Sequence, residues 1–495
     1  MTPDRRYELK WAVQDLIARN LLSSVLVFRG GAWLRHRVEG AHDAVGDLSF
    51  HGAVLDSRAV GAGQLFLGLS GERVDGRNYV GVALRAGAAA ALTRPWSEAG
   101  ADPLLSGDPG HDAAILLSDD PDAALTVLAA CWRRRCTVGL VAVTGTNGKT
   151  TTKDLLAALL TADGPTLATS GNYNNALGVP LTLLGLRAEH RWAVIEMGAS
   201  GPGEIADLAA LAAPRVGVIT NASGAHLEGF GDLETIVRTK GELLDHLPED
   251  GVAVLNADSA GFDAWRRRAR CSVVSWGETA GDHRWSWSPA AASDTGVLTI
   301  DGEAIPLPLP GRHNAANLCA AVIAARALAG PDLDIAGWLS HLRTSPHRSR
   351  LLTVAGITVL DDTYNANPAS VLAAGRALME LSGTGRTVVV LGSMAELGAE
   401  AAELHRDTGA ALAELGFDAV WAVGLHATDT AEGAVAAGAE GRVARDVEEA
   451  AAMMIVTLVA GDHVLVKGSR SAGMERVVEL FRTRREPDMS HLERS

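Results

Sequence analysis

The stretch that decides the fold is Val138-Gly-Leu-Val-Ala-Val-Thr-Gly-Thr-Asn-Gly-Lys-Thr150. Its first part, residues 138–143, is uncharged and rich in valine, which is typical of a strand buried on both faces of a parallel sheet. Residues 153–160 then follow a helical pattern of apolar positions. A glycine-rich turn between such a strand and a helix aims backbone N–H groups and the helix dipole at a phosphate group. We therefore predict a nucleotide-binding loop between this strand and this helix.

The loop itself supplies the predicted nucleotide contacts. Lys149 is expected to reach the outer phosphates, and Thr150 is expected to bind Mg²⁺. The standard phosphate-loop pattern has an earlier glycine that would fall at Val143, so the pattern alone leaves a chance turn as the alternative. The expected ATP-binding residues of the loop are Gly145, Thr146, Asn147, Gly148, Lys149, Thr150 and Thr151.

Strand and helix patterns alternate beyond the loop, which predicts a doubly wound parallel sheet. A Trp- and Ser-rich stretch at 276–288, with hairpin-like runs to 309, is expected to be antiparallel, and an alanine-rich helix is expected at 315–328. Further strands are expected at 192–195, 216–219, 252–255, 358–360, 387–391, 420–423 and 463–466.

A chain of 495 residues is too long for one hydrophobic core, and we predict an α/β protein of three domains. Residues 1–135 are expected to form a small α/β domain in which 1–50 are an atypical extension. Residues 136–346 are expected to form a central ATP-binding domain with a parallel sheet like that of P-loop ATPases. Residues 347–495 are expected to form a C-terminal, Rossmann-like α/β domain.

The net charge of −15 and the pI near 5.5 argue against nucleic acid or an anionic membrane as a partner, because such partners are held mainly by Lys and Arg. The first residues contain no long apolar run, so we expect neither a signal peptide nor a membrane span. A cytoplasmic protein is expected. The four cysteines lack metal-type or redox spacing, and we interpret them as reduced core thiols.

Only five of the 44 basic residues are lysines. Ordinary surface positions have therefore gone to arginine. Arginine cannot replace lysine where a compact ammonium or a neutral amine is needed, so the scarcity suggests a function for the remaining lysines. We interpret Lys10 as solvent-exposed and Lys153 as a helix residue beside the loop, which leaves Lys149, Lys240 and Lys467 as functional candidates.

The shortened loop closely resembles that of the Mur ligases, and similar motifs follow through most of the chain. The resemblance implies a three-domain ligase whose N-terminal domain holds a UDP-linked substrate. The other motifs are Gly171-Asn-Tyr-Asn-Asn-Ala-Leu-Gly-Val-Pro180, Ile195-Glu-Met-Gly198, Ala225-His-Leu-Glu-Gly-Phe-Gly231, Gly311-Arg-His-Asn-Ala-Ala-Asn317, Asp361-Asp-Thr-Tyr-Asn-Ala-Asn-Pro368, Gly392-Ser-Met-Ala-Glu-Leu-Gly398 and Val466-Lys-Gly-Ser-Arg470.

The resemblance also implies metal ligands and catalytic residues. Glu196 and His226 would bind two Mg²⁺ ions together with Thr150. Lys240 would carry a carbamate formed with CO₂, an anion that helps to hold Mg²⁺. Lys467 would face the reaction centre. Without the family motifs, each of three residues has a simpler alternative. Glu196 would be a helix-capping carboxylate, His226 a loop imidazole and Lys240 a surface lysine.

The remaining implied site residues fall into two groups. ATP contacts are expected from Asn314, Asn317, Asp362, Tyr364 and Asn365, and from an arginine that is either Arg348 or Arg350. Contacts with the UDP-linked substrate are expected from Ser57, Arg58, Asn174 and Asn175. Asn314 and Asn317 share one helical face by their spacing, near the adenine end of ATP, and Asp362 would take the ribose hydroxyls.

Within the family, the sequences of these motifs are most similar to those of the branch that adds D-alanyl-D-alanine to a UDP-N-acetylmuramoyl tripeptide. The implied reaction passes through an acyl phosphate, with small-molecule substrates and a monomeric enzyme. One alternative is a related ligase that uses another carboxylate or amine. Another is a P-loop kinase or hydrolase, which explains the loop but not the C-terminal motifs.

Overall fold

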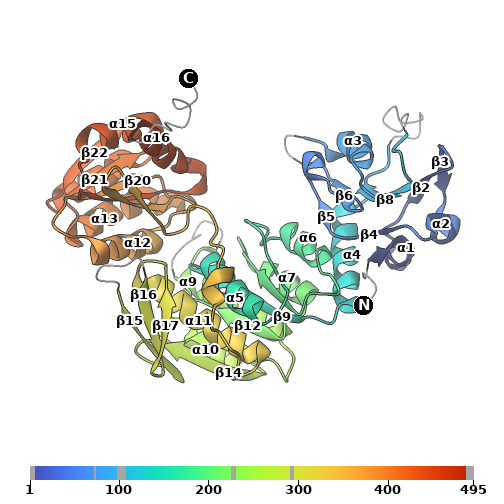
Figure 1. Cartoon of the computed structure of the whole chain (residues 1–495), viewed down its shortest axis with the longest axis horizontal. Coiled ribbons are helices and arrows are strands. Elements are labelled where there is room, and N and C mark those ends of the chain that lie inside the picture. The colour runs from blue at the N-terminus through green and yellow to red at the C-terminus, as the bar shows by residue number, and fades with distance from the viewer. Residues whose placement is uncertain (1–5, 72–73, 97–107, 224–229, 290–294, 486–495) are drawn as a thin grey trace. The chain divides into compact units, whose positions relative to one another are not determined.

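The computed structural model describes residues 6–71, 74–96, 108–223, 230–289 and 295–485 (Figure 1). The chain divides into two compact units. One comprises Met1–Ala142, Asp163–Gly198 and Glu204–Arg215, and the other comprises Val143–Ala162, Ala199–Gly203 and Val216–Ser495.

The N-terminal sheet has the strand order β3-β2-β8-β7-β6-β5. β5 to β8 pair in parallel, whereas β2 pairs antiparallel with both β3 and β8. Residues 6–50, which the sequence sets apart as an extension, thus contribute strands to this sheet. The elements are β1 (Tyr7–Glu8), α1 (Leu9–Ile17), β2 (Ser24–Arg29), β3 (Ala32–His36), α2 (Val38–Val45), β4 (Ser49–Phe50), β5 (Ala53–Val54), η1 (Ser57–Ala59), β6 (Leu65–Gly68), α3 (Val80–Arg85), β7 (Ala90–Thr93), β8 (Ala113–Leu117) and α4 (Pro121–Arg135).

The sheet that carries the glycine loop has the order β10-β11-β9-β12-β13-β14-β15-β16-β17. Its last strands, from β15 onward, pair antiparallel, as the hairpin-like sequence predicts. The prediction was wrong at 276–277, because Trp276 and Gly277 of β14 pair in parallel with β15. The elements are β9 (Gly139–Thr144), α5 (Lys149–Asp163), β10 (Thr166–Ala168), α6 (Gly178–Leu184), β11 (Trp192–Glu196), α7 (Glu204–Ala212), β12 (Val216–Ile219), α9 (Leu233–Lys240), β13 (Val252–Asn256), α10 (Phe262–Arg268), β14 (Ser272–Gly277), β15 (His283–Ser288), β16 (Gly296–Ile300), β17 (Glu303–Leu307) and α11 (Arg312–Ala329).

The C-terminal sheet has the order β18-β19-β23-β20-β21-β22 and is parallel except for β18. The elements are β18 (Arg350–Val354), β19 (Ile357–Asp362), α12 (Pro368–Leu381), β20 (Thr387–Gly392), α13 (Ala401–Glu414), β21 (Ala419–Val423), α14 (Ala427–Ala436), β22 (Glu440–Ala444), α15 (Val447–Thr457), β23 (His463–Lys467) and α16 (Glu475–Arg485).

Strand β20 shows why the middle of a central strand of this sheet, residues 388–391, is apolar. Val388 and Val390 pack into a core with side chains of α15 and α16, while Val389 and Leu391 pack into a second core with side chains of α12 and α13. Successive side chains point to opposite faces, so a strand covered on both sides needs apolar residues at every position. The ends of β19, β23 and β20 then lie side by side, because Asp362 and Leu391 both pair with Lys467.

The structure confirms the predicted α/β class. Every strand expected from an apolar run coincides with an observed strand, and the expected helices lie within α5 and α11. The domain boundaries at 135 and 346 stay predictions. Within the described ranges, none of the helices combines the length and hydropathy that crossing a bilayer requires.

Candidate nucleotide site

The glycine loop after β9 is shaped by two positions that only glycine can occupy. Gly145 and Gly148 have φ angles of +143° and +80°. A Cβ at Gly145 would lie 2.0 Å from Thr220 Oγ1, and a Cβ at Gly148 would lie 2.2 Å from Asn317 Oδ1. Both glycines are therefore required by backbone conformation and by close packing.

Residues after β12 hold the loop in place. The Asn147 N–H donates to Asn221 Oδ1 at 3.0 Å, and the Asn147 carbonyl accepts from Thr220 Oγ1 at 2.7 Å and from Asn221 Nδ2 at 3.0 Å. The sequence interpretation missed Thr220 and Asn221 as site residues. The available signal was their position directly after a predicted strand, because ligand sites of parallel sheets lie at the carboxyl ends of strands.

Lys149 folds back over the loop that precedes it. Its ammonium donates to the carbonyls of Gly145 and Thr146, each at 2.9 Å. The next residue, Thr150, is almost fully buried and its hydroxyl lies 3.3 Å from Arg348 Nη2. The loop thus concentrates a cation and a hydroxyl at the first turn of α5, where the helix dipole favours an anion.

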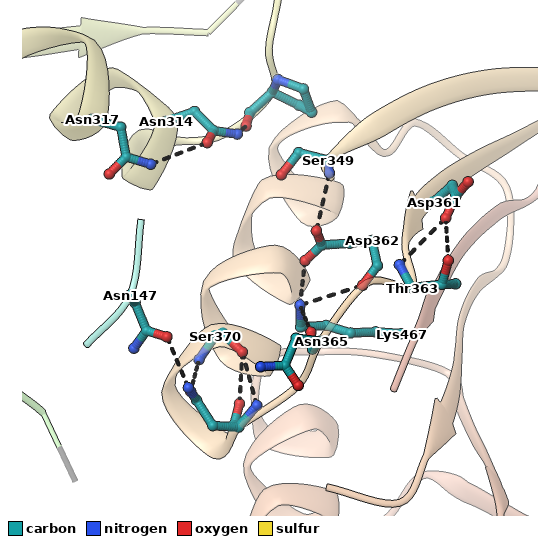
Figure 2. A network of polar contacts seen from close by, with 12 residues as sticks. Asn147, Asn314, Asn317, Ser349, Asp361, Asp362, Thr363, Asn365, Ser370 and Lys467 are labelled. Atoms are coloured by element: carbon teal, nitrogen blue, oxygen red, sulfur yellow. Dashed lines mark hydrogen bonds and ion pairs between the residues drawn. The ribbon is translucent and has the colours of Figure 1, made fainter. Parts of the chain in front are cut away.

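The asparagines of α11 lie against this loop. Asn314 is fully buried and its Nδ2 donates to the Pro310 carbonyl at 2.8 Å. Asn317 Nδ2 reaches Asn314 Oδ1 at 3.4 Å (Figure 2). Asn317 Oδ1 accepts from Thr152 Oγ1 at 3.4 Å. The two residues share a face of α11, as their spacing predicts. Their contact with adenine stays a prediction.

The geometry separates the two candidate arginines. Arg348 lies over the Tyr364 ring, with the guanidinium carbon 4.1 Å from the ring centroid. Its Nε is buried and, among the described residues, has no hydrogen-bond partner. Arg350 is exposed and starts strand β18. Arg348 is therefore the arginine beside the loop.

A buried ion pair joins the ends of β19 and β23 (Figure 2). The Lys467 ammonium pairs with the Asp362 carboxylate and also donates to the Asn365 carbonyl at 2.9 Å. Asp362 accepts in addition from the Ser349 N–H at 3.0 Å. Burial alone would raise the pKa of Asp362, but Lys467 outweighs it and holds this pKa below its ordinary value. Asp362 is therefore a fixed anion.

Asn367 is a second site residue that the sequence interpretation missed. Its Nδ2 donates to Asn147 Oδ1 at 2.8 Å, which joins the start of α12 to the loop. Its Oδ1 accepts from the Ser370 N–H at 2.9 Å and thereby caps α12. The signal was an asparagine before Pro368, a common helix start, but a cap alone does not predict a contact with a nucleotide loop.

Glu196 ends β11 and is 1% exposed. Its Oε1 accepts from Asn174 Nδ2 at 2.8 Å, whereas its Oε2 is buried and has no hydrogen-bond partner within the described ranges. A buried carboxylate oxygen without a partner is rare in proteins and suits a hard cation such as Mg²⁺. Asn175 uses its Oδ1 to accept from the N–H groups of Leu177 and Gly178, at the start of α6.

The remaining predicted site residues are placed as follows. His226 lies outside the described residues. Lys240 ends α9, is 3% exposed and lies over the Phe230 ring, 5.1 Å from its centroid. In η1, Arg58 is exposed and its Nη2 is 2.7 Å from Asp56 Oδ2, an interaction that lowers the pKa of Asp56 to about 2. Ser57 lies beside it in η1.

In the part of the chain that the structure describes, no group of three or more His, Cys, Asp or Glu side chains could hold a metal by itself.

Family comparisons agree over most of the chain. The Mur ligase middle domain matches residues 143–325, the Mur ligase glutamate ligase domain matches 347–470, and the Mur ligase family catalytic domain matches 49–101. The chain is 37% identical over 456 residues to the UDP-N-acetylmuramoyl-tripeptide--D-alanyl-D-alanine ligase of Escherichia coli (strain K12), covering 87% of this chain and 94% of that protein. The enzyme of the same name from Bacillus subtilis (strain 168) is 34% identical over 435 residues, covering 87% and 92%.

Solved structures agree with these matches. MurF from Acinetobacter baumannii superposes with a TM-score of 0.79 at 30% identity, covering 97% of this chain and 99% of that one. The MurF ligase from Thermotoga maritima in complex with ADP has a TM-score of 0.74 at 29% identity, covering 88% and 98%.

Proposed function

The chain belongs to the Mur ligase family, and we propose that it uses ATP to join D-alanyl-D-alanine to a UDP-N-acetylmuramoyl tripeptide. Relatives named for this reaction match it over more than nine-tenths of their own length. The observation that carries the proposal is the meeting of the glycine loop with Arg348 and Asn367, which come from the C-terminal part of the chain. A P-loop kinase or hydrolase does not require these residues.

The proposed reaction has two steps. A carboxylate oxygen of the tripeptide attacks the γ-phosphorus of ATP, the bond to ADP breaks, and an acyl phosphate forms. The amine of the dipeptide then attacks the acyl carbon, phosphate leaves, and the nitrogen loses a proton. The tripeptide carboxylate and ATP are both anions, so cations must offset the repulsion between them. We assign this task to Lys149 in the loop and to Arg348, whose Nε–H has no acceptor among the described residues.

Asp362 and Lys467 have a supporting task in this proposal. The pair is buried, so the carboxylate is held in one position and can accept from the hydroxyls of the ribose on its remaining lone pairs. Lys467 acts on the nucleotide through Asp362 and through the Asn365 carbonyl. Its expected contact with the reaction centre stays a prediction.

The residues present fit a magnesium requirement. When bound, Mg²⁺ neutralises phosphate charge and polarises the phosphoryl oxygens. Glu196 offers its buried Oε2, which has no partner in the part of the chain that the structure describes, and Asn174 fixes the other oxygen of the same carboxylate. Thr150 offers its hydroxyl at the first turn of α5. We propose Glu196 as a ligand, while Thr150 stays a predicted ligand and His226 stays a predicted ligand of a second ion.

A carbamate at Lys240 fits the described surroundings less well than an ammonium. The Lys240 Nζ faces the Phe230 ring at 5.1 Å from the centroid. The face of an aromatic ring carries partial negative charge, which attracts a cation and repels an anion such as a carbamate. The carbamate at Lys240 therefore stays a prediction, and no step of the proposed reaction is routed through it.

The UDP-linked substrate is assigned to the N-terminal part of the chain. We propose that residues 1–135 bind it through Ser57 and Arg58, that 136–346 bind ATP, and that 347–495 complete the site. Arg58 suits an anionic group because its side chain is 88% exposed and its guanidinium is already oriented by Asp56. A cytoplasmic monomer stays a prediction.

The test is direct. The purified protein is incubated with ATP, Mg²⁺, UDP-N-acetylmuramoyl tripeptide and D-alanyl-D-alanine, and ADP and the product mass are measured. We expect ADP release that requires both co-substrates and a product heavier than the tripeptide by one dipeptide less water. ADP release without the dipeptide would indicate a hydrolase or kinase, and no release with this pair would exclude the assigned substrates.

A further inference from the structure

His347, Arg348 and Ser349 form a short arch that leads into β18. His347 and Ser349 have φ angles of +61° and +46°, so the arginine is flanked on both sides by left-handed residues. Glycine adopts this conformation freely and asparagine tolerates it, whereas other residues adopt it at a cost in free energy. Strained residues of this kind persist where neighbouring groups hold them, and they gather at functional sites.

Groups at the end of β19 hold both flanks of the arch. The His347 Nδ1–H donates to the Asp361 carboxylate at 2.9 Å, and the His347 carbonyl accepts from the Tyr364 N–H at 3.1 Å. On the other flank, the Ser349 N–H donates to Asp362 at 3.0 Å (Figure 2). The arch is thus attached at three points, and Arg348 lies between them.

Asp361 is itself fixed. It is 1% exposed, and its Oδ1 accepts from the Thr363 hydroxyl at 2.7 Å and from the Thr363 N–H at 3.3 Å (Figure 2). Its Oδ2 is left for His347. A buried carboxylate that is anchored on one oxygen can place a partner precisely with the other, since neither group has room to move.

We infer that Asp361 and His347 are positioning residues that aim Arg348 at the terminal phosphate of ATP. The inference rests on the proposed use of ATP. Arg348 Nη2 lies 3.3 Å from the Thr150 hydroxyl, at the phosphate end of the loop. The Tyr364 ring lies against the guanidinium. The buried Nε has no acceptor among the described residues, so its N–H can donate to a ligand. ADP lacks the terminal phosphate. The contact between His347 and Asp361 therefore contributes to the binding of ATP and contributes little to the binding of ADP.

The experiment compares two ligands on the full chain. Dissociation constants of ADP and of the non-hydrolysable ATP analogue AMPPCP are measured by calorimetry in the presence of Mg²⁺. The variants are His347→Ala, His347→Gly and His347→Asn. Glycine at position 347 relieves the backbone strain but makes no hydrogen bond to Asp361. Asparagine tolerates the left-handed conformation and can donate its amide N–H to Asp361. The control is His283→Ala, which removes the histidine of another His–Asp pair, on β15.

We expect the Ala and Gly variants to bind the analogue about 10- to 100-fold more weakly, the effect of losing one charge-assisted hydrogen bond at a buried site. ADP binding should change by no more than about twofold, which also shows that the variants are folded. The Asn variant and the control should behave like the wild type, and Asp361→Asn should weaken the analogue in the same direction as Ala.

Equal losses for ADP and the analogue, or an unchanged analogue affinity in both the Ala and Gly variants, would overturn the inference. Recovery by Gly without recovery by Asn would also overturn it, because strain alone would then explain the effect. A wild-type protein that binds both nucleotides but makes no dipeptide product would refute the proposed reaction and leave this inference standing.

Discussion

Replacing Gly148 with alanine tests whether the loop is built by close packing as well as by backbone conformation. The new Cβ would lie 2.2 Å from Asn317 Oδ1 and 3.0 Å from Asn317 Cγ, in a residue whose φ is +80°. The left-handed conformation alone costs alanine roughly 1–2 kcal/mol. Forcing an extra carbon into a packed site adds about 1–3 kcal/mol. We therefore expect the free energy of unfolding to fall by about 2–5 kcal/mol.

Two comparisons separate these contributions. Gly438 has a φ of +97° and open space where its Cβ would stand, so Gly438→Ala should show the conformational cost alone. Asn317→Ala removes the atoms that the new Cβ meets. In a double-mutant cycle with Gly148→Ala, the double variant should therefore be more stable than the sum of the single effects predicts, by about 1–3 kcal/mol.

The assay is denaturant unfolding of the four variants and the wild type, followed by ADP titration of each. Gly148→Ala should also lose ADP binding, whereas Gly438→Ala should keep it. If Gly148→Ala costs no more than Gly438→Ala, or if the cycle is additive within about 0.5 kcal/mol, the packing argument is wrong.

Three further predictions follow from buried charges. Asp362→Asn should cost about 3–5 kcal/mol of unfolding free energy, because it leaves the Lys467 ammonium buried and unpaired, while Asp362→Leu with Lys467→Met should recover most of this loss. His405 accepts from the Met394 N–H through Nε2 at 2.9 Å, so it must be neutral, and burial holds its pKa below the ordinary value. Its contribution to stability is complete above about pH 6.5 and is lost as pH falls below it, so His405→Gln should flatten the pH dependence of unfolding over this range. Glu196→Gln removes a buried carboxylate with an unpartnered oxygen, and should lower Mg²⁺-dependent ADP release about 100-fold or more without lowering the melting temperature.

The strands of the two parallel sheets could be predicted because burial on both faces leaves a local signal. Residues 388–391 are apolar at every position, since Val388 and Val389 face two different cores. The N-terminal sheet left a weaker signal. Its strand β2 pairs antiparallel with β8, which lies far along the chain, and such long-range pairing has no local pattern. Residues 1–50 were set apart as an extension, whereas their described part contributes β2 and β3 to this sheet.

The individual segments of the site could be predicted from the sequence, but the contacts between those segments could not. The loop was found from a strand, a glycine turn and a helix in succession. The groups that brace it, Thr220, Asn221 and Asn367, are single polar residues that follow separate elements, and only the packing of those elements brings them to Asn147. Short polar residues after strands are common, so the sequence contains no pattern that distinguishes these from ordinary turns.

The choice between Arg348 and Arg350 shows a physical limit of such reasoning. The two positions are equivalent in residue type and lie two residues apart. The arch that turns Arg348 toward the loop depends on left-handed conformations at His347 and Ser349, and neither residue type signals a positive φ as glycine or asparagine would. The conformation is instead imposed by Asp361 and Asp362, so the information lies in the tertiary contacts.

The scarcity of lysine predicted a function for Lys149, Lys240 and Lys467 without revealing what each lysine does. Lys153, Lys240 and Lys467 are each 3% exposed, whereas the Lys10 side chain is 41% exposed. At Lys467 the reason for lysine is the geometry of its acceptors. The Asp362 carboxylate, the Asp362 carbonyl and the Asn365 carbonyl converge on one Nζ, and a compact ammonium has three N–H groups to meet them. A planar guanidinium has its donors in one fixed fork and needs more room, so arginine would leave acceptors unpaired in a buried site. The composition therefore marks Lys467 as a position where the arrangement of donors excludes arginine, and this holds whether or not its side chain ever meets a substrate.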